Sequence, residues 1–481
     1  MSIVNNLKWL GLSKAIQIAL QLISFTVLAR LLDPSEYGLM AMAMVVTNFT
    51  IIVRDLGTAA AIIQRKVLDQ RIKSTVFWLN IILGVSLALI IMISSPLIAK
   101  LFNELALIPV LLWLALSFPI ASLGVAQQAL LERESHFRKV AIIEIFASAI
   151  ALAVALGMAY EGFGVYSLVG QTLVNCSIST LLLWRAAYWR PSFIFDISQL
   201  RQLLGFSGNL TAFNFINYFS RNSDAMIIGY YFSAAVLGAY SLAYRVMLFP
   251  LQSLTSVVSR SMYPLMSRKQ DNLEQIKAMY LKVLTFIASI TAPMMAGLVV
   301  LRDPFVSITF GAQWTLVPYI LLWLAPTGFV QSLVSTTGSV FMANGKTQLL
   351  MRLGIVSAIL QVGAFVIGGQ YDVQTLALLY LVANLLNSIP VMYFTMQTVN
   401  GKLLEVAQCL VAPLLCSTIM VMVLLFASHY SAIMISDQYH AMFAGHIVLG
   451  ILVYVASYRL LFAKKMAQVL PAKLAKWFLL G

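Results

Sequence analysis

The sequence predicts an all-α membrane protein with about fourteen transmembrane helices, in two six-helix lobes followed by two further helices. Three observations lead to this prediction. Of the 481 residues, 61% are hydrophobic and 10% are charged, and the mean hydropathy is +0.90, whereas a globular domain has about 25% charged residues. Apolar runs of about 20 residues, enough to cross a bilayer, follow one another along the chain. Short sequence patterns among the first six runs recur among the next six.

Each predicted helix is an apolar run in which the backbone can satisfy its own polar groups inside lipid. Six runs lie in a first lobe, 1–200, six in a second, 201–400, and two in 401–463. We expect residues 464–481 to form either an amphipathic piece along the headgroups or a disordered tail. The runs are Trp9–Leu31, Gly38–Ile63, Thr75–Ala99, Leu105–Leu131, Val140–Tyr160, Gly164–Ala187, Leu204–Tyr231, Ala235–Val258, Met279–Leu301, Leu316–Met342, Leu349–Gly369, Thr375–Thr398, Val406–Ala427 and Ala441–Phe462.

The charge pattern orients these helices. The net charge of +14 comes from Lys and Arg in short gaps between apolar runs, which is typical of loops facing the cytoplasm and argues against nucleic acid as a partner. With both termini in the cytoplasm, the outer loops hold only two basic residues, Lys100 and Arg302, but several acids. Basic residues of the inner loops and helix ends include Arg65, Lys66, Arg71, Lys73, Arg133, Arg138, Lys139, Arg268 and Lys269, and the outer acids are Asp33, Glu36, Glu104, Glu161, Asp303, Asp372 and Asp437.

The two lobes share an internal repeat. The pattern of Leu107–Ala115, with its Leu-Leu-Trp-Leu-Ala ending, recurs in Leu316–Ala325. Because each lobe has an even number of helices, both enter the membrane in the same direction, and the repeat is parallel. Other matching positions are Pro96 and Pro304, Phe102 and Phe310, Ser148 and Ser357, Asn175 and Asn384, and Gly38 and Gly238.

Polar residues line one face of the first helix and of its repeat-equivalent, the seventh. Their spacing of three or four residues places them on one side of a helix. A polar face inside lipid indicates a cavity or a partner helix. The first helix carries Lys14, Gln17, Gln21 and Ser24, and the seventh carries Ser207, Thr211, Asn214, Tyr218 and Arg221.

Two further cations, Arg54 and Arg245, lie in the helices that directly follow these polar faces. Together with Lys14 and Arg221 they are staggered across the membrane. A cavity with such a lining favours an anion, because a phosphate gains more from Arg and Lys in a low dielectric than in water. The alternative is a structural role, in which acids such as Asp55 and Asp224 neutralise neighbouring cations.

Three acids within the spans are candidates for coupling to protons or sodium: Asp55, Glu144 and Asp224. Pairing of Glu144 with Arg138 or Lys139 is the structural alternative. No cofactor is expected. The three cysteines lie inside apolar runs and the four histidines are scattered, so the sequence predicts neither a disulfide framework nor a metal site.

Several stretches resemble Wzx-type polysaccharide flippases of the multidrug/oligosaccharidyl-lipid/polysaccharide exporter superfamily, and they are similar to colanic-acid-exporter-like members. The resemblance is strongest between residue 10 and about residue 345, and the last two helices share only number and hydrophobicity with the family. The stretches are Thr26–Arg30 with Tyr37–Gly38, Asp55–Gly57, Ile62–Lys66, Val76–Asn80, Ser241–Val246, Tyr263–Pro264, Met266–Ser267 and Phe310–Gly311 with Trp314.

This resemblance implies a V-shaped cavity between two lobes and alternating access that flips an undecaprenyl-diphosphate-linked oligosaccharide across the bacterial inner membrane. By position, Lys14, Arg54 and Arg245, with Arg221, would bind the diphosphate. Implied partners are the lipid-linked oligosaccharide and membrane lipids, with polysaccharide polymerase and chain-length proteins as further candidates.

Other functions stay open at this point. A cation-coupled drug exporter of the same superfamily is one, although such exporters commonly carry an acid in the first helix and this sequence has none there. A flippase for peptidoglycan precursors is a second. A membrane glycosyltransferase or polymerase is a third, but such an enzyme needs loops carrying catalytic groups, and the outer loops here are short.

Overall fold

The computed structural model describes residues 3–54, 62, 68–196, 222–250, 256–434 and 439–469. Every regular element in these residues is a helix, which confirms the predicted all-α class. Ten described segments are long and apolar enough to cross a membrane, and Ile16–Leu31 and Ala234–Phe249 are shorter apolar helices. The expected total of about fourteen spans stays a prediction, because residues 197–221 and other parts of the expected spans lie outside the described residues.

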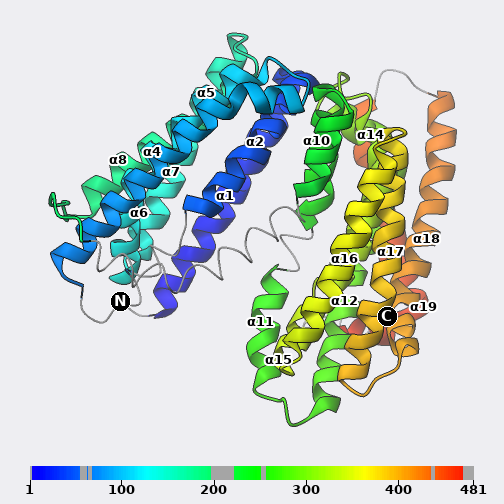
Figure 1. The fold of residues 1–481 in the computed structure, drawn as a ribbon. Helices are drawn as coiled ribbons and strands as arrows, with labels where there is room; N and C mark the ends of the chain where they lie inside the picture. The colour runs from blue at the N-terminus through cyan, green and yellow to red at the C-terminus, as the bar shows by residue number, and fades with distance from the viewer. Residues whose placement is uncertain are drawn as a thin grey trace. The chain divides into compact units, whose positions relative to one another are not determined.

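The chain divides into two compact units, Met1–Gly238 and Ala239–Gly481. In the first unit, long helices run side by side (Figure 1), with α7 against α1 and α8, and α4 against α5 and α6. The expected fourth span is divided at Leu116 into two helices. The helices are α1 (Ile3–Leu31), α2 (Pro34–Arg54), α4 (Gln70–Leu101), α5 (Leu107–Ala115), α6 (Ser117–Arg133), α7 (Phe137–Tyr160) and α8 (Val165–Ala186).

In the second unit, α12 packs against α14 and α18, α17 packs against α14 and α16, and α18 packs against α19. The expected tenth span is divided between α14 and α15. Helix α19 is kinked at Phe462, where the backbone is not helical, and a second helical stretch extends from there into the expected tail. Residues 470–481 lie outside the described residues. The helices are α10 (Ala234–Pro250), which begins in the first unit, α11 (Ser256–Ser267), α12 (Leu273–Val300), α13 (Arg302–Thr309), α14 (Val317–Val334), α15 (Thr337–Ala343), α16 (Thr347–Gly368), α17 (Val373–Thr398), α18 (Leu403–Met434) and α19 (Tyr439–Val469).

The repeated segments bury the same positions in both units. In α5, Leu111, Leu114 and Ala115 are buried, and so are their counterparts in α14, Leu321, Leu324 and Ala325. The long helices α4 and α12 also begin alike, since Asp69 accepts a hydrogen bond from the Ile72 amide and Asn272 accepts one from the Gln275 amide. These side chains satisfy backbone donors that a helix start leaves free. Equivalent packing and capping support the internal repeat.

Helix α19 is anchored to α12 by polar contacts inside the bundle, and α18 packs beside it. The Tyr454 hydroxyl of α19 donates to the backbone oxygen of Ser289 at 2.8 Å, and the Tyr458 hydroxyl lies 3.2 Å from Ser289 Oγ. Ala412, Cys416 and other apolar side chains pack around the tyrosines. A buried hydroxyl needs such a partner because no water reaches it. Helices α18 and α19 are therefore an integral part of the second unit.

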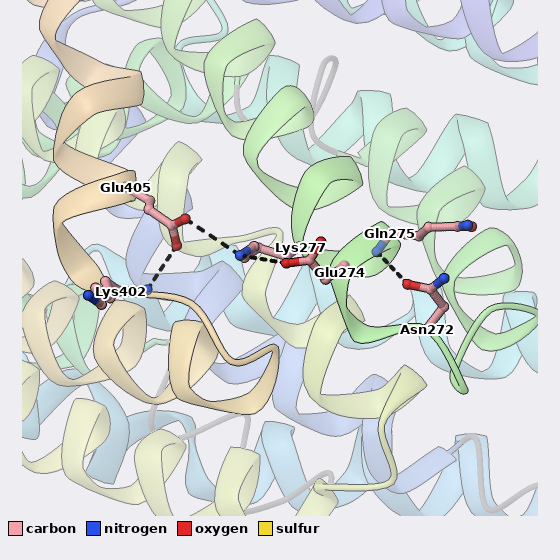
Figure 2. A network of polar contacts seen from close by, with 6 residues as sticks. All are labelled: Asn272, Glu274, Gln275, Lys277, Lys402 and Glu405. Carbon is pink, nitrogen blue, oxygen red and sulfur yellow. Dashed lines mark hydrogen bonds and ion pairs between the residues drawn. The ribbon is translucent and has the colours of Figure 1, made fainter.

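An ion-pair network ties the start of α18 to the start of α12 (Figure 2). Lys277 Nζ lies 3.5 Å from Glu274 Oε1 and 3.6 Å from Glu405 Oε1. The other carboxylate oxygen of Glu405 accepts a hydrogen bond from the Lys402 amide at 2.9 Å. Because Glu274 is exposed, this network contributes little to stability. Its main effect is to orient α18 against α12.

The segment that leaves α8 is held against the start of α4. Gln70 Nε2 donates to Ser192 Oγ at 2.8 Å, and Gln70 Oε1 accepts from Trp189 Nε1 at 2.6 Å. Trp78 Nε1 also donates to the Ser192 backbone oxygen at 2.9 Å. Residues 187–196, which lead toward the second half of the sequence, are thus fixed to the first unit. We call these residues the linker segment.

Two repeat-equivalent glycines make a backbone contact within the first unit. A methyl group on Gly38 would collide with the backbone oxygen of Ala234, and one on Gly238 would collide with that of Pro34. The beginnings of α2 and α10 therefore touch through their backbones, an approach that small residues allow in membrane helices. The sequence match between Gly38 and Gly238 thus has a packing cause.

We expect Gly38→Ala and Gly238→Ala to destabilise the protein by about 1–3 kcal/mol, because the new methyl group meets backbone that cannot rotate away. Gly157→Ala is the matched control, since its methyl group would have no neighbour within 4 Å, and it should be neutral or stabilising by about 0.4–1 kcal/mol. Thermal unfolding of the purified variants in detergent measures the difference. Equal midpoints for all three would contradict the contact.

Candidate functional site

Two of the four polar residues on the first helix bond to other helices of the first unit. Gln17 Nε2 donates to Glu144 Oε2 on α7 at 2.8 Å. Ser24 Oγ accepts from Gln171 Nε2 on α8 at 2.9 Å. Gln21 is exposed. The polar face of α1 therefore joins α1 to α7 and α8, and leaves Gln21 for contacts outside the bundle.

Glu144 is half-buried, and the partner that the structure gives it is Gln17 instead of the expected Arg138 or Lys139. An amide can donate a hydrogen bond to this carboxyl group but brings no opposite charge to it. Helices α7 and α8 are linked as well, since Asn175 Nδ2 lies 3.3 Å from Ser148 Oγ. A polar layer thus runs through α1, α7 and α8.

The second unit also has a polar network, which shares two positions with that of the first unit but has different chemistry. Gln331 Nε2 on α14 donates to the Tyr380 hydroxyl at 2.7 Å and to Asn384 Oδ1 at 3.1 Å, both on α17. By the repeat, Asn384 corresponds to Asn175, and Tyr380 therefore corresponds to Gln171. The position matching Glu144 holds Leu353, which is buried. Of these two networks, only that of the first unit contains a carboxylate.

The four predicted cations are only partly within the described residues. Lys14 lies in α1 and Arg54 ends α2, but the side chains of both are outside the described part. Arg221 is also outside it. The side chain of Arg245 is exposed on α10. Their role as a binding site for an anion stays a prediction.

The other predicted site residues also lie partly within and partly outside the described residues. Asp224 is buried, and its Oδ1 accepts a hydrogen bond from the Ala225 amide at 2.7 Å. Among the described residues no three His, Cys, Asp or Glu side chains gather in a way that could hold a metal ion. The residues that lie outside the described part are Asp55, Thr211, Asn214 and Tyr218.

Sequence patterns alone did not mark Gln171, Gln331 or Tyr380 as site candidates. Gln171 lies four residues before Asn175, so both share one face of α8. The same spacing relates Tyr380 to Asn384 on α17. Polar residues at this spacing inside an apolar run, repeated in both lobes, were the signal that could have identified Gln171 and Tyr380.

Many apolar helices, two helical units with a shared internal repeat, and polar residues buried between helices define a multi-pass membrane protein. Residues 27–318 match the family described as polysaccharide biosynthesis protein. The chain belongs to this family.

Named relatives agree with this assignment. The chain is 29% identical to the lipopolysaccharide biosynthesis protein WzxC of Escherichia coli K12, over 82% of this chain and 80% of WzxC. It is 30% identical to the teichuronic acid biosynthesis protein TuaB of Bacillus subtilis 168, over 72% of each chain. Among solved structures, the lipid II flippase MurJ in an inward closed conformation superposes with a TM-score of 0.76 at 16% identity, covering 95% of this chain and 99% of MurJ. The MurJ likeness shows a shared fold.

The Gln17–Glu144 contact leads to a prediction for stability. Glu144→Ala leaves the half-buried Gln17 amide without its acceptor, and we expect a loss of about 1–2 kcal/mol. Glu144→Gln keeps an acceptor oxygen and should change stability by less than about 0.5 kcal/mol. Glu161→Ala, an exposed carboxylate at the other end of α7, is the control.

Unfolding midpoints in detergent give these differences. If Glu144→Ala has the same unfolding midpoint as the wild type, the hydrogen bond contributes nothing to the stability of the first unit.

Proposed function

We propose that this protein flips an undecaprenyl-diphosphate-linked oligosaccharide repeat unit across the bacterial inner membrane by alternating access. The unit would serve the synthesis of exopolysaccharide, capsule or O-antigen. The observation that carries the proposal is the family match over residues 27–318. It is supported by relatives named for making lipopolysaccharide and teichuronic acid, and by a fold shared with a lipid II flippase.

In this proposal both termini are cytoplasmic, as the distribution of basic residues indicates. The protein acts as a transporter and not as an enzyme, and polysaccharide polymerase and chain-length proteins are candidate partners downstream. A cysteine introduced at Asp303 should then react with an impermeant maleimide added to intact spheroplasts, whereas one at Arg71 should not. The opposite labelling would invert the orientation.

The diphosphate is the part of the substrate that most needs protein partners inside lipid, because its charges lose hydration there. We assign Lys14, Arg54, Arg221 and Arg245 to it, with Gln21, Thr211, Asn214 and Tyr218 as polar lining. Arginine suits this role because its guanidinium can bind two phosphate oxygens at once. The exposed position of Arg245 on α10 is compatible with a side chain that meets a substrate.

Deletion of the gene in a host that makes a surface polysaccharide tests the function. We expect loss of surface polymer together with lipid-linked repeat units retained on the cytoplasmic side, and restoration by a plasmid copy. Drug sensitivity with normal polymer would instead indicate an efflux pump. Loss of the repeat units themselves would indicate an enzyme of their synthesis.

The same complementation assay tests the cations. Arg54→Ala, Arg221→Ala and Arg245→Ala should each reduce polymer export at least about tenfold, the effect of losing about 1.4 kcal/mol of phosphate binding, while membrane levels stay unchanged. Lys100→Ala, which removes a cation from an outer helix end, is the control. Normal export by all three arginine variants would refute the assignment.

Energy coupling is proposed at Glu144, with Asp55 and Asp224 as further candidates for a proton or sodium site. Support for Glu144 comes from its half-buried carboxylate next to Gln17 and from the apolar Leu353 at the equivalent position of the second unit. Glu144→Gln should fold normally yet lose transport driven by an imposed proton or sodium gradient. If it transports as the wild type does, coupling belongs to another residue.

A further inference from the structure

A cavity of about 190 Å³ lies at one end of the first unit, where α4 begins, α6 turns into α7, and α8 meets the linker segment. Its wall includes Lys73 of α4 and Lys139 of α7, together with Tyr188 and Trp189 of the linker segment. None of these residues belongs to the proposed transport machinery. The three chain segments that meet here are all predicted to face the cytoplasm.

The two lysines of the cavity wall form no ion pair among the described residues, and the wall has a net positive charge. Within the described part of the chain, neither Lys73 nor Lys139 has a carboxylate at salt-bridge distance. Glu134 also lines the cavity, and its Oε2 lies 3.2 Å from Nδ1 of His136, so the wall holds two cations and one carboxylate. The Lys139 ammonium lies 5.8 Å from the centre of the Tyr188 ring, a distance at which a cation and an aromatic face attract each other. Two cations are thus available to an anion.

The depth of the cavity in the membrane follows from the length of α4. Its 32 residues extend about 48 Å at 1.5 Å per residue, whereas the hydrocarbon core is about 30 Å thick. Lys73, in the first turn, therefore lies at the level of the lipid headgroups. Trp78, Trp184 and Trp189 gather beside it in one cluster, as tryptophans do at a membrane interface.

The volume of the cavity limits the class of ligand that it can hold. Pockets that hold drug-sized molecules have about 300–1,000 Å³, so a cavity of about 190 Å³ suits a single phosphate with a small substituent. A phosphate with a small substituent, at headgroup depth and beside interfacial tryptophans, matches the headgroup of a phospholipid.

We propose that this cavity binds the headgroup of an anionic phospholipid, with Lys73 and Lys139 as the partners of the phosphodiester. On the proposed orientation the lipid belongs to the cytoplasmic leaflet, but binding itself does not depend on the proposed function. Because the cavity joins α4, α7 and the linker segment, a bound headgroup bridges three parts of the first unit.

The test uses the full-length protein in lipid nanodiscs that contain a photoactivatable phosphatidylglycerol. Crosslinks should form in peptides that cover residues 130–139 and 186–190. Removal of each lysine by Lys73→Ala or Lys139→Ala should weaken labelling about fivefold, the usual effect of one cation at an anionic surface. Ala186→Trp, which fills the cavity without changing its charge, should also abolish it.

Arg71→Ala is the matched control, because Arg71 is an exposed cation on the same helix turn that does not line the cavity. It should keep normal labelling, and a photoactivatable phosphatidylcholine should label the peptides weakly. Equal labelling by both lipids, or an equal loss in Arg71→Ala and Lys73→Ala, would overturn the proposal. Displacement of the probe by millimolar inorganic phosphate would also overturn it, in favour of a soluble phosphate.

Discussion

A polar side chain within the hydrocarbon layer has to find its partner on another helix, and this constraint determines how the helices of each unit face one another. Lipid tails are as apolar as leucine, so apolar surfaces alone give little preference for one helix rotation over another. In the first unit, Glu144 and Gln171 fix α7 and α8 against α1. In the second, Gln331 fixes α14 against α17, and Ser289 of α12 receives the tyrosines of α19.

Hydrophobicity predicted most of the fold, because long apolar runs and their order follow directly from the chemistry of the bilayer. It did not predict the break at Leu116 between α5 and α6. The sequence mark there is Pro119, which lacks the N–H that would bond to the Ala115 carbonyl oxygen in a continuous helix. The division between α14 and α15 has no such mark, since serine and threonine at positions 335–337 are tolerated inside membrane helices.

The candidate site was less predictable than the fold. Helical spacing placed Gln17 and Ser24 on one face, but spacing cannot say whether that face meets a neighbouring helix or a passage, and both residues proved to have partners inside the bundle. Gln171 was recognised as a candidate only from its contact with Ser24 in the structure. The repeat adds that the two units are alike in packing and unlike in charge, because leucine stands at position 353 where the first unit has Glu144.

The attachment of the linker segment to α4 bears on how the chain is made. The side chains that hold it, Gln70, Ser74 and Trp78, all precede it in the sequence. Once residue 196 has left the ribosome, both partners of each of these contacts have therefore been synthesised. Domains generally fold in the order of synthesis, so the linker segment can pack against α4 during translation, before the helices of the second unit enter the membrane.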